Sequence, residues 1–243
     1  MQRAAAVFSA TIAVAACPAL AQHWAYEGEA APQNWGKLDP KFALCASGKN
    51  QSPIDLAGFI EAQLKPLALD YKAGAASIVN NGHTVQVDYA AGSTLAIDGG
   101  RFELQQFHFH SPSENRINGK AFALEGHLVH ADKDGNLAVV AVMFQEGAAN
   151  ALLARLWEKM PAKAGDKSAL PAGINAAQLL PKDRDYYRFN GSLTTPPCSE
   201  GVRWLVMKKP VTASKAQIEQ FSRVVGGANN RPLQPVYARP VLK

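Results

Sequence analysis

The sequence predicts a mainly β protein in one domain, with antiparallel strands and little helix. Between residues 50 and 145, short segments alternate apolar and polar side chains, as strands with one buried face do. Glycine and asparagine separate nearly all of these segments, which is typical of hairpin turns. Only two stretches have the spacing of an amphipathic helix. At 243 residues with 47% hydrophobic side chains, the chain is long enough to bury a substantial core.

The chain begins with the pattern of an export leader. Arg3 precedes an apolar run over 4–16, and the small residues of 19–21 resemble a signal-peptidase site. The apolar run is shorter than the ~20 residues that span a bilayer, and no other stretch approaches that length. The sequence therefore predicts no transmembrane segment.

Two forms of processing are consistent with this leader. The first is removal of 1–21 as a signal peptide, which leaves 22–243 as an exported mature domain. The second follows from residues 14–17, which resemble a bacterial lipoprotein site after which Cys17 would carry lipid. Both interpretations export the protein.

The strands and turns follow one another in order through the first half of the mature chain. The predicted strands are residues 78–79, 84–89, 94–97, 102–109, 122–130 and 137–144. The predicted turns are residues 80–82, 98–100, 118–119 and 134–136. These turns argue for an antiparallel component in the sheet.

Two helices and one surface segment are expected after these strands. Residues 148–160 have helical spacing and end before Pro161, and residues 214–225 follow N-cap candidates at 212–214. The tract 162–181 is rich in Ala, Gly and Pro, and we interpret it as an excursion on the surface of the domain rather than as a linker.

Cys45 and Cys198 are the only cysteines left after removal of the leader. In an exported protein disulfides persist, so we predict that these two are bonded and join the two halves of the chain in one domain. The alternative is two buried free thiols.

The charge balance argues against a polyanionic partner. The formal net charge is +5, or +4 without Arg3, and Lys and Arg form no stripe interleaved with aromatic residues. The sequence therefore gives little support for nucleic-acid binding. It leaves open whether two copies associate as a homodimer.

Three histidines predict a metal site. His108 and His110 share one face of a predicted strand, and His127 lies on the next predicted strand along the chain. Pairing of these strands would bring three imidazoles around one ion. Three neutral nitrogen ligands suit Zn²⁺, and a tetrahedral ion with three protein ligands keeps one position for water, as in catalytic sites. Gln106 shares the face of His108 and Glu125 that of His127, so both could fix a ligating ring.

From Trp24 almost to its C-terminus the chain resembles the α-class carbonic anhydrases. The matching segments are QSPID (51–55), NNGH (80–83), FHFH (107–110), SE (113–114), EGHLVH (125–130), GSLTTPPC (191–198) and NNRPLQP (229–235). The short leader and the single Cys45/Cys198 pair resemble the exported bacterial branch, which implies a periplasmic location. The resemblance implies a large twisted sheet with a few short peripheral helices, and reversible hydration of carbon dioxide to bicarbonate by zinc-bound hydroxide.

The resemblance also assigns roles to individual residues. His108, His110 and His127 would bind zinc, with Gln106, Glu125 and the backbone carbonyl of Asn229 supporting them. Thr194 would orient the hydroxide with Glu114 behind it, and His83 would carry the proton to solvent by histidine-mediated transfer. The residues implied in substrate binding are Val129, Val139, Leu193, Thr195, Val202 and Trp204. The polar supports implied for the proton pathway are Tyr26, Asn81 and Gln86, of which Gln86 stands where some relatives have asparagine.

Two other functions are consistent with the same fold. Relatives that have lost a zinc ligand are non-catalytic binding modules, but this sequence retains all three histidines with Thr194 and Glu114. A zinc hydrolase acting on activated esters would use the same hydroxide, although no acyl pocket beyond Thr194 is apparent.

Overall fold

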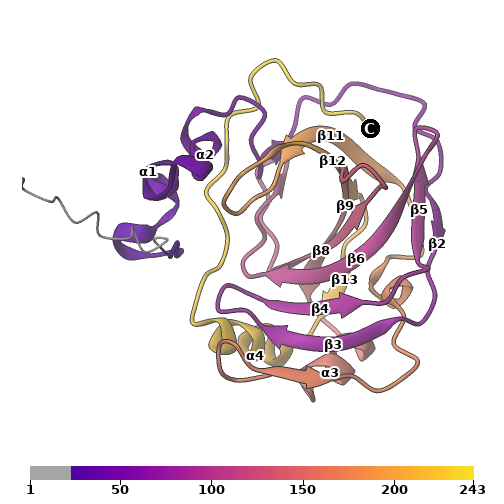
Figure 1. Cartoon of the computed structure of the whole chain (residues 1–243). Helices are drawn as coiled ribbons and strands as arrows, with labels where there is room; N and C mark the ends of the chain where they lie inside the picture. Colours follow the sequence, from indigo (N-terminus) through magenta and orange to yellow (C-terminus); the bar gives the residue numbers. More distant parts are fainter. Residues whose placement is uncertain (1–22) are drawn as a thin grey trace, which may run out of the picture.

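The computed structural model describes residues 23–243, so the predicted leader and Cys17 lie outside the described residues. One curved sheet of eleven strands dominates this part of the chain (Figure 1). Its main path runs β10-β3-β4-β6-β8-β9-β12-β11, while β2 pairs with β5, β5 with β6, and β13 with β9. The expectation of a mainly β fold with few helices is confirmed.

The strands differ greatly in length, and the longest lie at the centre of the sheet. Those of the large sheet are β2 (Ala68–Asp70), β3 (Ala75–Asn80), β4 (Val85–Tyr89), β5 (Thr94–Ile97), β6 (Gly100–His110), β8 (Leu124–Ala131), β9 (Leu137–Glu146), β10 (Lys167–Ala169), β11 (Tyr186–Ser192), β12 (Glu200–Met207) and β13 (Val211–Ala213). A separate parallel pair is formed by β1 (Asp55–Leu56) and β7 (Arg116–Ile117).

Every predicted strand is present, but the sheet is mixed rather than purely antiparallel. From β3 to β9 the neighbouring strands pair antiparallel, as the turns predict. Beyond this, β12 and β13 both pair with β9 in parallel. The strands β11 and β12 were not predicted, because β12 is buried along most of its length and lacks the alternation that identifies a half-exposed strand.

The predicted surface excursion over 162–181 needs correction. Its residues Lys167–Ala169 form β10, which pairs antiparallel with β3 at the sheet edge. Ile174, Ala176 and Leu179 of the same tract are buried in the main core. The small residues of this tract favour neither a strand nor an irregular loop strongly. Pairing with β3 and packing in the core therefore determine its structure.

The helices are short and lie at the periphery (Figure 1). They are η1 (Gly28–Ala30), η2 (Pro32–Asn34), α1 (Trp35–Leu38), η3 (Pro40–Phe42), α2 (Leu44–Ser47), α3 (Ala151–Trp157), η4 (Ala176–Leu179) and α4 (Lys215–Val225). The predicted helices correspond to α3, shorter than expected, and to α4, where Ser214 and Gln217 form a capping box. Among the described residues, no helix combines the length and apolar character that crossing a bilayer requires.

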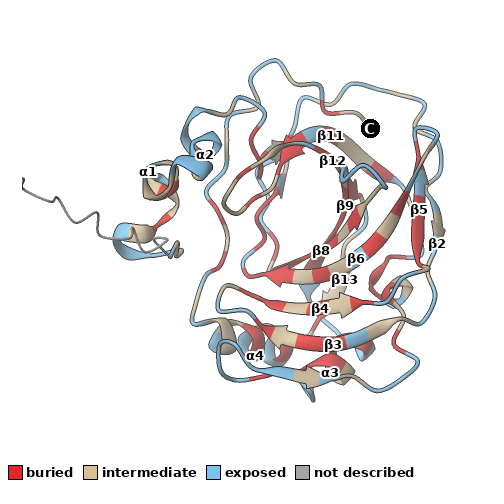
Figure 2. Ribbon diagram, viewed as in Figure 1, coloured by how far each residue is buried: buried red, intermediate tan, exposed pale blue. Residues whose placement is uncertain are grey.

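The two faces of the sheet pack against different apolar clusters. Figure 2 shows buried residues along the central strands. Phe107 and Phe109 of β6 point into the larger cluster, which α3 and α4 cover with Leu153, Trp157 and Phe221. The opposite face carries the histidines and a smaller apolar cluster. Strand alternation therefore separates the main core from the candidate site.

A disulfide between Cys45 and Cys198 joins the N-terminal helices to the segment after β11, as predicted. The two Cα atoms are 5.1 Å apart across 153 positions of sequence. Trp35 packs beside the disulfide, and Trp24 and Tyr26 pack against this small cluster. The bond therefore holds the N-terminal segment against the sheet domain.

Removing this disulfide should destabilise the fold. A bond that closes so long a loop restricts the unfolded chain strongly, so we expect Cys45→Ser to lower the free energy of unfolding by about 2–5 kcal/mol. Guanidinium denaturation of the variant and the oxidised wild type measures the difference. Identical midpoints and slopes for the two proteins would contradict this role of the bond.

Candidate metal centre

Two central strands carry the three histidines and set their spacing. In the antiparallel pairing of β6 with β8, His108 lies directly opposite His127, and His110 lies opposite Glu125. Phe107 and Phe109, on the other face of β6, are fully buried and fix the orientation of the strand. The pattern of alternation therefore turns all three imidazoles toward one side of the sheet.

The three rings converge on a common point. One nitrogen from each of His108, His110 and His127 lies within 4.8 Å of the others. Each remaining ring nitrogen donates to a separate acceptor. His108 Nδ1 donates to Gln106 Oε1 at 2.8 Å, and His110 Nδ1 to the Asn229 carbonyl at 2.7 Å. His127 Nε2 donates to Glu125 Oε1 at 2.9 Å, so each ring leaves one lone pair for the centre.

The electrostatics keep these rings neutral, as metal ligands must be. Burial lowers the pKa of all three, and repulsion from the neighbouring imidazoles lowers those of His108 and His127 further. His110 Nε2 is buried and has no hydrogen-bond partner among the described residues. A buried lone pair without a donor is costly unless a cation uses it. The residues therefore fit an ion that accepts three imidazole nitrogens.

The carboxylate of Glu125 is held more firmly than the sequence indicated. Its Oε2 accepts from the backbone N–H groups of Glu114 and Asn115, both at 2.8 Å. Its Oε1 also accepts from Asn115 Nδ2 at 2.7 Å. Asn115 was not among the predicted site residues. Its position beside Glu114 in the sequence was the only available signal.

Glu114 is fully buried beside the imidazoles. Its Oε1 accepts from the backbone N–H of Arg231 at 2.9 Å, and its Oε2 lies 3.5 Å from His110 Nε2 and 3.9 Å from His127 Nδ1. Burial raises the pKa of Glu114 to about 8, against the lowering effect of hydrogen bonds from Arg231 and Thr194. Glu114 Oε2 nevertheless has no partner of standard hydrogen-bond geometry among the described residues. A bound cation would favour the ionised carboxylate.

Arg231 is a second residue whose importance the sequence did not reveal. Its guanidinium is buried and donates to Gln51 Oε1 and to the carbonyls of Ser52 and Cys45. These bonds join the N-terminal segment to the strand connection that carries Glu114. Arg231 lies within a quoted motif, but only the fold shows what it contacts.

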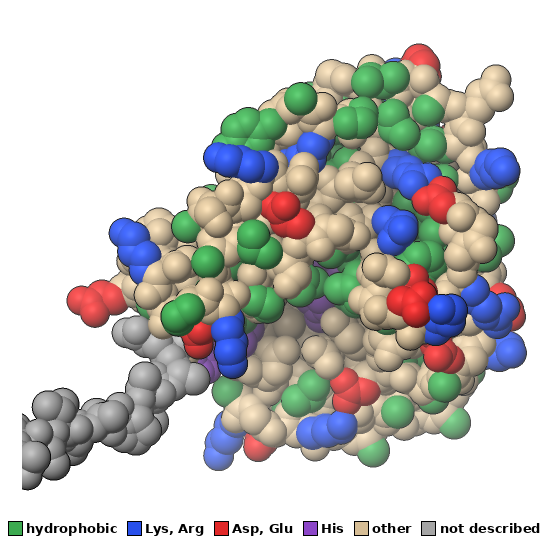
Figure 3. Space-filling model, turned by 45° about the horizontal axis from the view of Figure 1, so that its top comes forward, with side chains coloured by type: hydrophobic (Ala, Val, Ile, Leu, Met, Phe, Trp, Pro, Cys, Tyr) green, Lys and Arg blue, Asp and Glu red, His purple; other side chains and the backbone are tan. Residues whose placement is uncertain are grey.

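The predicted proton-pathway residues line a hollow of about 130 Å³ that reaches His108 and His110. Histidine side chains are visible between the N-terminal segment and the sheet domain in Figure 3. The wall of this hollow includes His83, Tyr26, Asn81, Gln86 and Thr195. The Asn81 side chain accepts from the backbone N–H of His83 at 3.0 Å, and Gln86 donates to Asp88 at 2.8 Å. The Tyr26 hydroxyl is buried and without a partner among the described residues, and burial raises its pKa.

The predicted apolar wall lies together beside the imidazoles. Val139, Val202 and Trp204 are buried in the smaller cluster, and Val129 and Leu193 pack against it while remaining partly exposed. The Trp204 ring meets His127 edge to face, with centroids 4.8 Å apart. The structure thus brings these five side chains into one cluster, which contacts His127 through Trp204.

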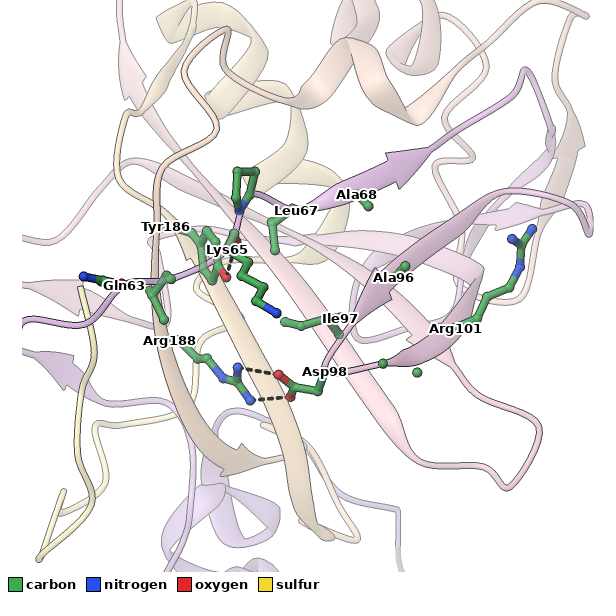
Figure 4. Close-up of a pocket in the computed structure, with 14 residues that line it drawn as sticks. Gln63, Lys65, Leu67, Ala68, Ala96, Ile97, Asp98, Arg101, Tyr186 and Arg188 are labelled. Atoms are coloured by element: carbon green, nitrogen blue, oxygen red, sulfur yellow. Dashed lines mark hydrogen bonds and ion pairs between the residues drawn. The ribbon is translucent and has the colours of Figure 1, made fainter.

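A larger hollow lies elsewhere, between residues 63–68 and β5 (Figure 4). Its volume is about 650 Å³, but none of the predicted site residues lines it. Its one carboxylate, on Asp98, is already engaged by Arg188, and Tyr186 donates to the Lys65 carbonyl. Size alone therefore does not identify the site; the histidines do.

Comparisons with known proteins place the chain in one family. The profile of the family described as Eukaryotic-type carbonic anhydrase matches residues 30–243. "Carbonic anhydrase" of Pectobacterium carotovorum is 54% identical over 220 residues, which cover 90% of each chain. The solved structure of alpha-carbonic anhydrase from Thermovibrio ammonificans with the inhibitor sulfanilamide is 49% identical, with a TM-score of 0.90 over 91% of this chain and 99% of that one.

A protein with a different name has a similar fold. Dioscorin, solved in complex with ascorbate, is 35% identical with a TM-score of 0.85, over 90% of this chain and 97% of that one. Fold likeness alone therefore does not fix the activity. The profile match and the 54% identity with a carbonic anhydrase are nevertheless decisive for kinship. The chain belongs to the eukaryotic-type, or alpha, carbonic anhydrase family.

Proposed function

We propose that this protein catalyses the reversible hydration of carbon dioxide to bicarbonate and a proton, with one Zn²⁺ held by His108, His110 and His127. The observation that carries the proposal is the buried set of three neutral imidazoles, each fixed by its own acceptor and each leaving one nitrogen toward a shared point. Zinc bound by three nitrogens supplies a nucleophile at neutral pH, because it lowers the pKa of bound water to about 7.

Thr194 and Glu114 are proposed to orient the attacking oxygen. The carboxylate of Glu114, fixed by the Arg231 backbone N–H, would accept a hydrogen bond from the Thr194 hydroxyl. Since a hydroxyl has only one proton to donate, the Thr194 oxygen can then only accept from the nucleophile. The pair thereby selects an oxygen that still carries a proton. The Thr194 backbone N–H would donate to an oxygen of the developing bicarbonate.

The apolar side chains beside His127 are proposed to hold the substrate. Carbon dioxide is small and carries no charge, so an apolar wall suits it better than a charged group. Val129 and Leu193 are the partly exposed members of this wall, and Val139, Val202 and Trp204 support them from the cluster behind. Thr195 lines the adjoining hollow.

His83 is proposed to pass the released proton toward solvent. We expect His83→Ala to lower kcat several-fold in dilute buffer. The kcat of the variant should rise again as buffer is added, because external base then replaces the imidazole. Stopped-flow rates across a buffer series test this. An equal loss at every buffer concentration would contradict the shuttle assignment, with kcat/KM for carbon dioxide serving as the internal control.

The activity itself is tested on one zinc-loaded sample. Zinc content, carbon dioxide hydration and hydrolysis of an activated ester are measured side by side, before and after chelation. We expect one zinc per chain and hydration that is lost on chelation and regained with zinc. A zinc-loaded protein that cleaves the ester but does not hydrate carbon dioxide would overturn the proposal.

We also propose export to the bacterial periplasm after removal of residues 1–21. The Cys45–Cys198 disulfide supports an oxidising compartment, and the similar carbonic anhydrase of Pectobacterium carotovorum is bacterial. N-terminal sequencing of the protein recovered from the periplasm tests the cleavage. A mature protein that starts at a lipid-modified Cys17 would support the alternative processing instead.

A further inference from the structure

The hollow between residues 63–68 and β5 forms where a strand pair ends (Figure 4). Ala68 and Ala96 are the last residues that pair at this end of the β2–β5 ladder. Continued antiparallel pairing would set Pro66 opposite Asp98, and proline has no backbone N–H to donate. The chain before Ala68 therefore diverges from β5, and a space of about 650 Å³ opens between the two segments.

Apolar side chains line the inner side of this hollow. Leu64 and Leu67 pack against the main core, and Ile97 and Tyr186 are buried within that core. The Tyr186 hydroxyl donates its proton to the Lys65 carbonyl at 2.9 Å. A volume of about 650 Å³ is within the range of small-molecule sites. A ligand here has to cover apolar surface, and a polyhydroxylated molecule would leave hydroxyl groups without partners over these side chains.

Positive charge exceeds negative charge around the same hollow. Its lining includes three cations, on Lys65, Arg101 and Arg188, but only one carboxylate, on Asp98. The Arg188 guanidinium donates to both oxygens of Asp98, with the first of these bonds at 2.8 Å. Hydrogen bonds from Arg188 lower the pKa of Asp98, and the charges of Arg188, Arg203 and Lys65 lower it further. The carboxylate is therefore ionised and already engaged, and it does not balance the other cations.

Lys65 is the cation that remains free to bind an anion. Its side chain extends toward Asp98 in Figure 4, but within residues 23–243 its ammonium group forms no ion pair. An ammonium group beside an apolar surface suits a ligand that combines one negative charge with an apolar body.

We infer that this hollow is a binding site for a monocarboxylate with an apolar acyl body, such as a medium-chain fatty acid. The acyl body would lie along Leu64, Leu67 and Ile97, and the carboxylate would pair with the Lys65 ammonium. The excess of positive charge would repel a metal ion, and a small inorganic anion would leave the apolar side chains in contact with water. None of the lining residues belongs to the proposed metal centre, so the inference does not depend on the proposed reaction.

Calorimetric titration of the zinc-loaded protein with octanoate tests the site. We expect saturable binding of one octanoate per chain. Acetate, which lacks the acyl body, and octanol, which lacks the charge, should each bind at least about tenfold more weakly. The absence of saturable octanoate binding would overturn the inference. So would octanol or acetate that binds as tightly as octanoate.

Substitutions in the hollow locate the bound anion. Lys65→Gln removes the ammonium group and should lower the affinity for octanoate roughly tenfold, the usual loss for a charged hydrogen bond. Lys215→Gln is the matched control, because Lys215 lies on α4 with a side chain that is 72% exposed and does not line the hollow. We expect the control to bind octanoate as the wild type does. Equal losses in the two variants would reduce the effect to net charge and overturn the site.

A third variant fills the hollow. Ala96 is exposed in its wall, so Ala96→Trp should occupy the space without disturbing the core and should abolish octanoate binding. An unchanged unfolding midpoint shows that the variant is folded. Octanoate binding that survives Ala96→Trp and disappears when zinc is removed would place the carboxylate on the metal centre and overturn the inference.

Discussion

Replacing His108 with alanine is expected to abolish zinc binding and carbon dioxide hydration together. Two imidazoles remain in the variant, and the Gln106 side chain loses the ring that it holds. Without the ion, the pKa of water is no longer lowered to about 7, so the concentration of the hydroxide nucleophile at the site falls by roughly eight to nine orders of magnitude. Metal analysis after dialysis, paired with stopped-flow hydration, measures both losses.

A histidine on the opposite face of the same strand pair provides the matched control. His130 lies three positions after His127 on β8, but it faces the main core, where its Nε2 lies 2.7 Å from the Tyr71 hydroxyl. We expect His130→Gln to keep stoichiometric zinc and to lose about 1–3 kcal/mol of stability through disrupted buried hydrogen bonds. Full zinc content and activity in His108→Ala would refute the metal centre.

Replacing Thr194 with alanine should leave zinc in place and reduce turnover by roughly 10²–10³-fold, the usual loss for one preorganised hydrogen bond. The three imidazoles and their acceptors do not depend on the Thr194 hydroxyl. In the proposed mechanism only the orientation of the nucleophile depends on this hydroxyl, through the buried Glu114. Zinc content and kcat/KM for carbon dioxide, measured on the same sample, separate the two effects.

Thr194→Ser is the control for this prediction. Serine keeps the hydroxyl that donates to Glu114 and loses only a methyl group, so we expect it to retain most of the activity. Equal losses in Thr194→Ala and Thr194→Ser would mean that packing of the methyl group, rather than the hydrogen bond, is what matters. Wild-type activity in Thr194→Ala would remove Thr194 from the mechanism.

The sequence predicted the cluster of three histidines because its geometry is local. Alternation along β6 and β8 fixes which side chains share a face, and antiparallel pairing brings His108 opposite His127. The turns could also be predicted from the sequence, because hairpins and tight turns require positive φ at positions that glycine favours. Positive φ is found at Gly82, Gly99, Gly119 and Gly135. Short-range rules therefore suffice for the ligands and the central strands.

The surroundings of the centre depend on contacts that no local pattern encodes. Arg231 reaches Cys45 across 186 positions of sequence, and Glu114 depends on the Arg231 backbone across 117. The parallel pairing of β12 with β9 likewise joins segments that no turn connects. The resemblance to a family supplied Glu114, Thr194 and Asn229 at the sequence level, whereas Asn115 and the Arg231 guanidinium emerged only from the fold.

The same long-range contacts constrain when the protein can mature. The carbonyl that steadies His110 belongs to Asn229, and the Arg231 guanidinium must meet the Cys45 and Ser52 carbonyls. A ribosome synthesises residues 229–231 long after the three histidines, so a nascent polypeptide that lacks them also lacks the contacts that hold His110 and Glu114. If zinc binds as proposed, the complete set of supporting contacts is available to it only after folding has brought residues 229–231 to the central strands.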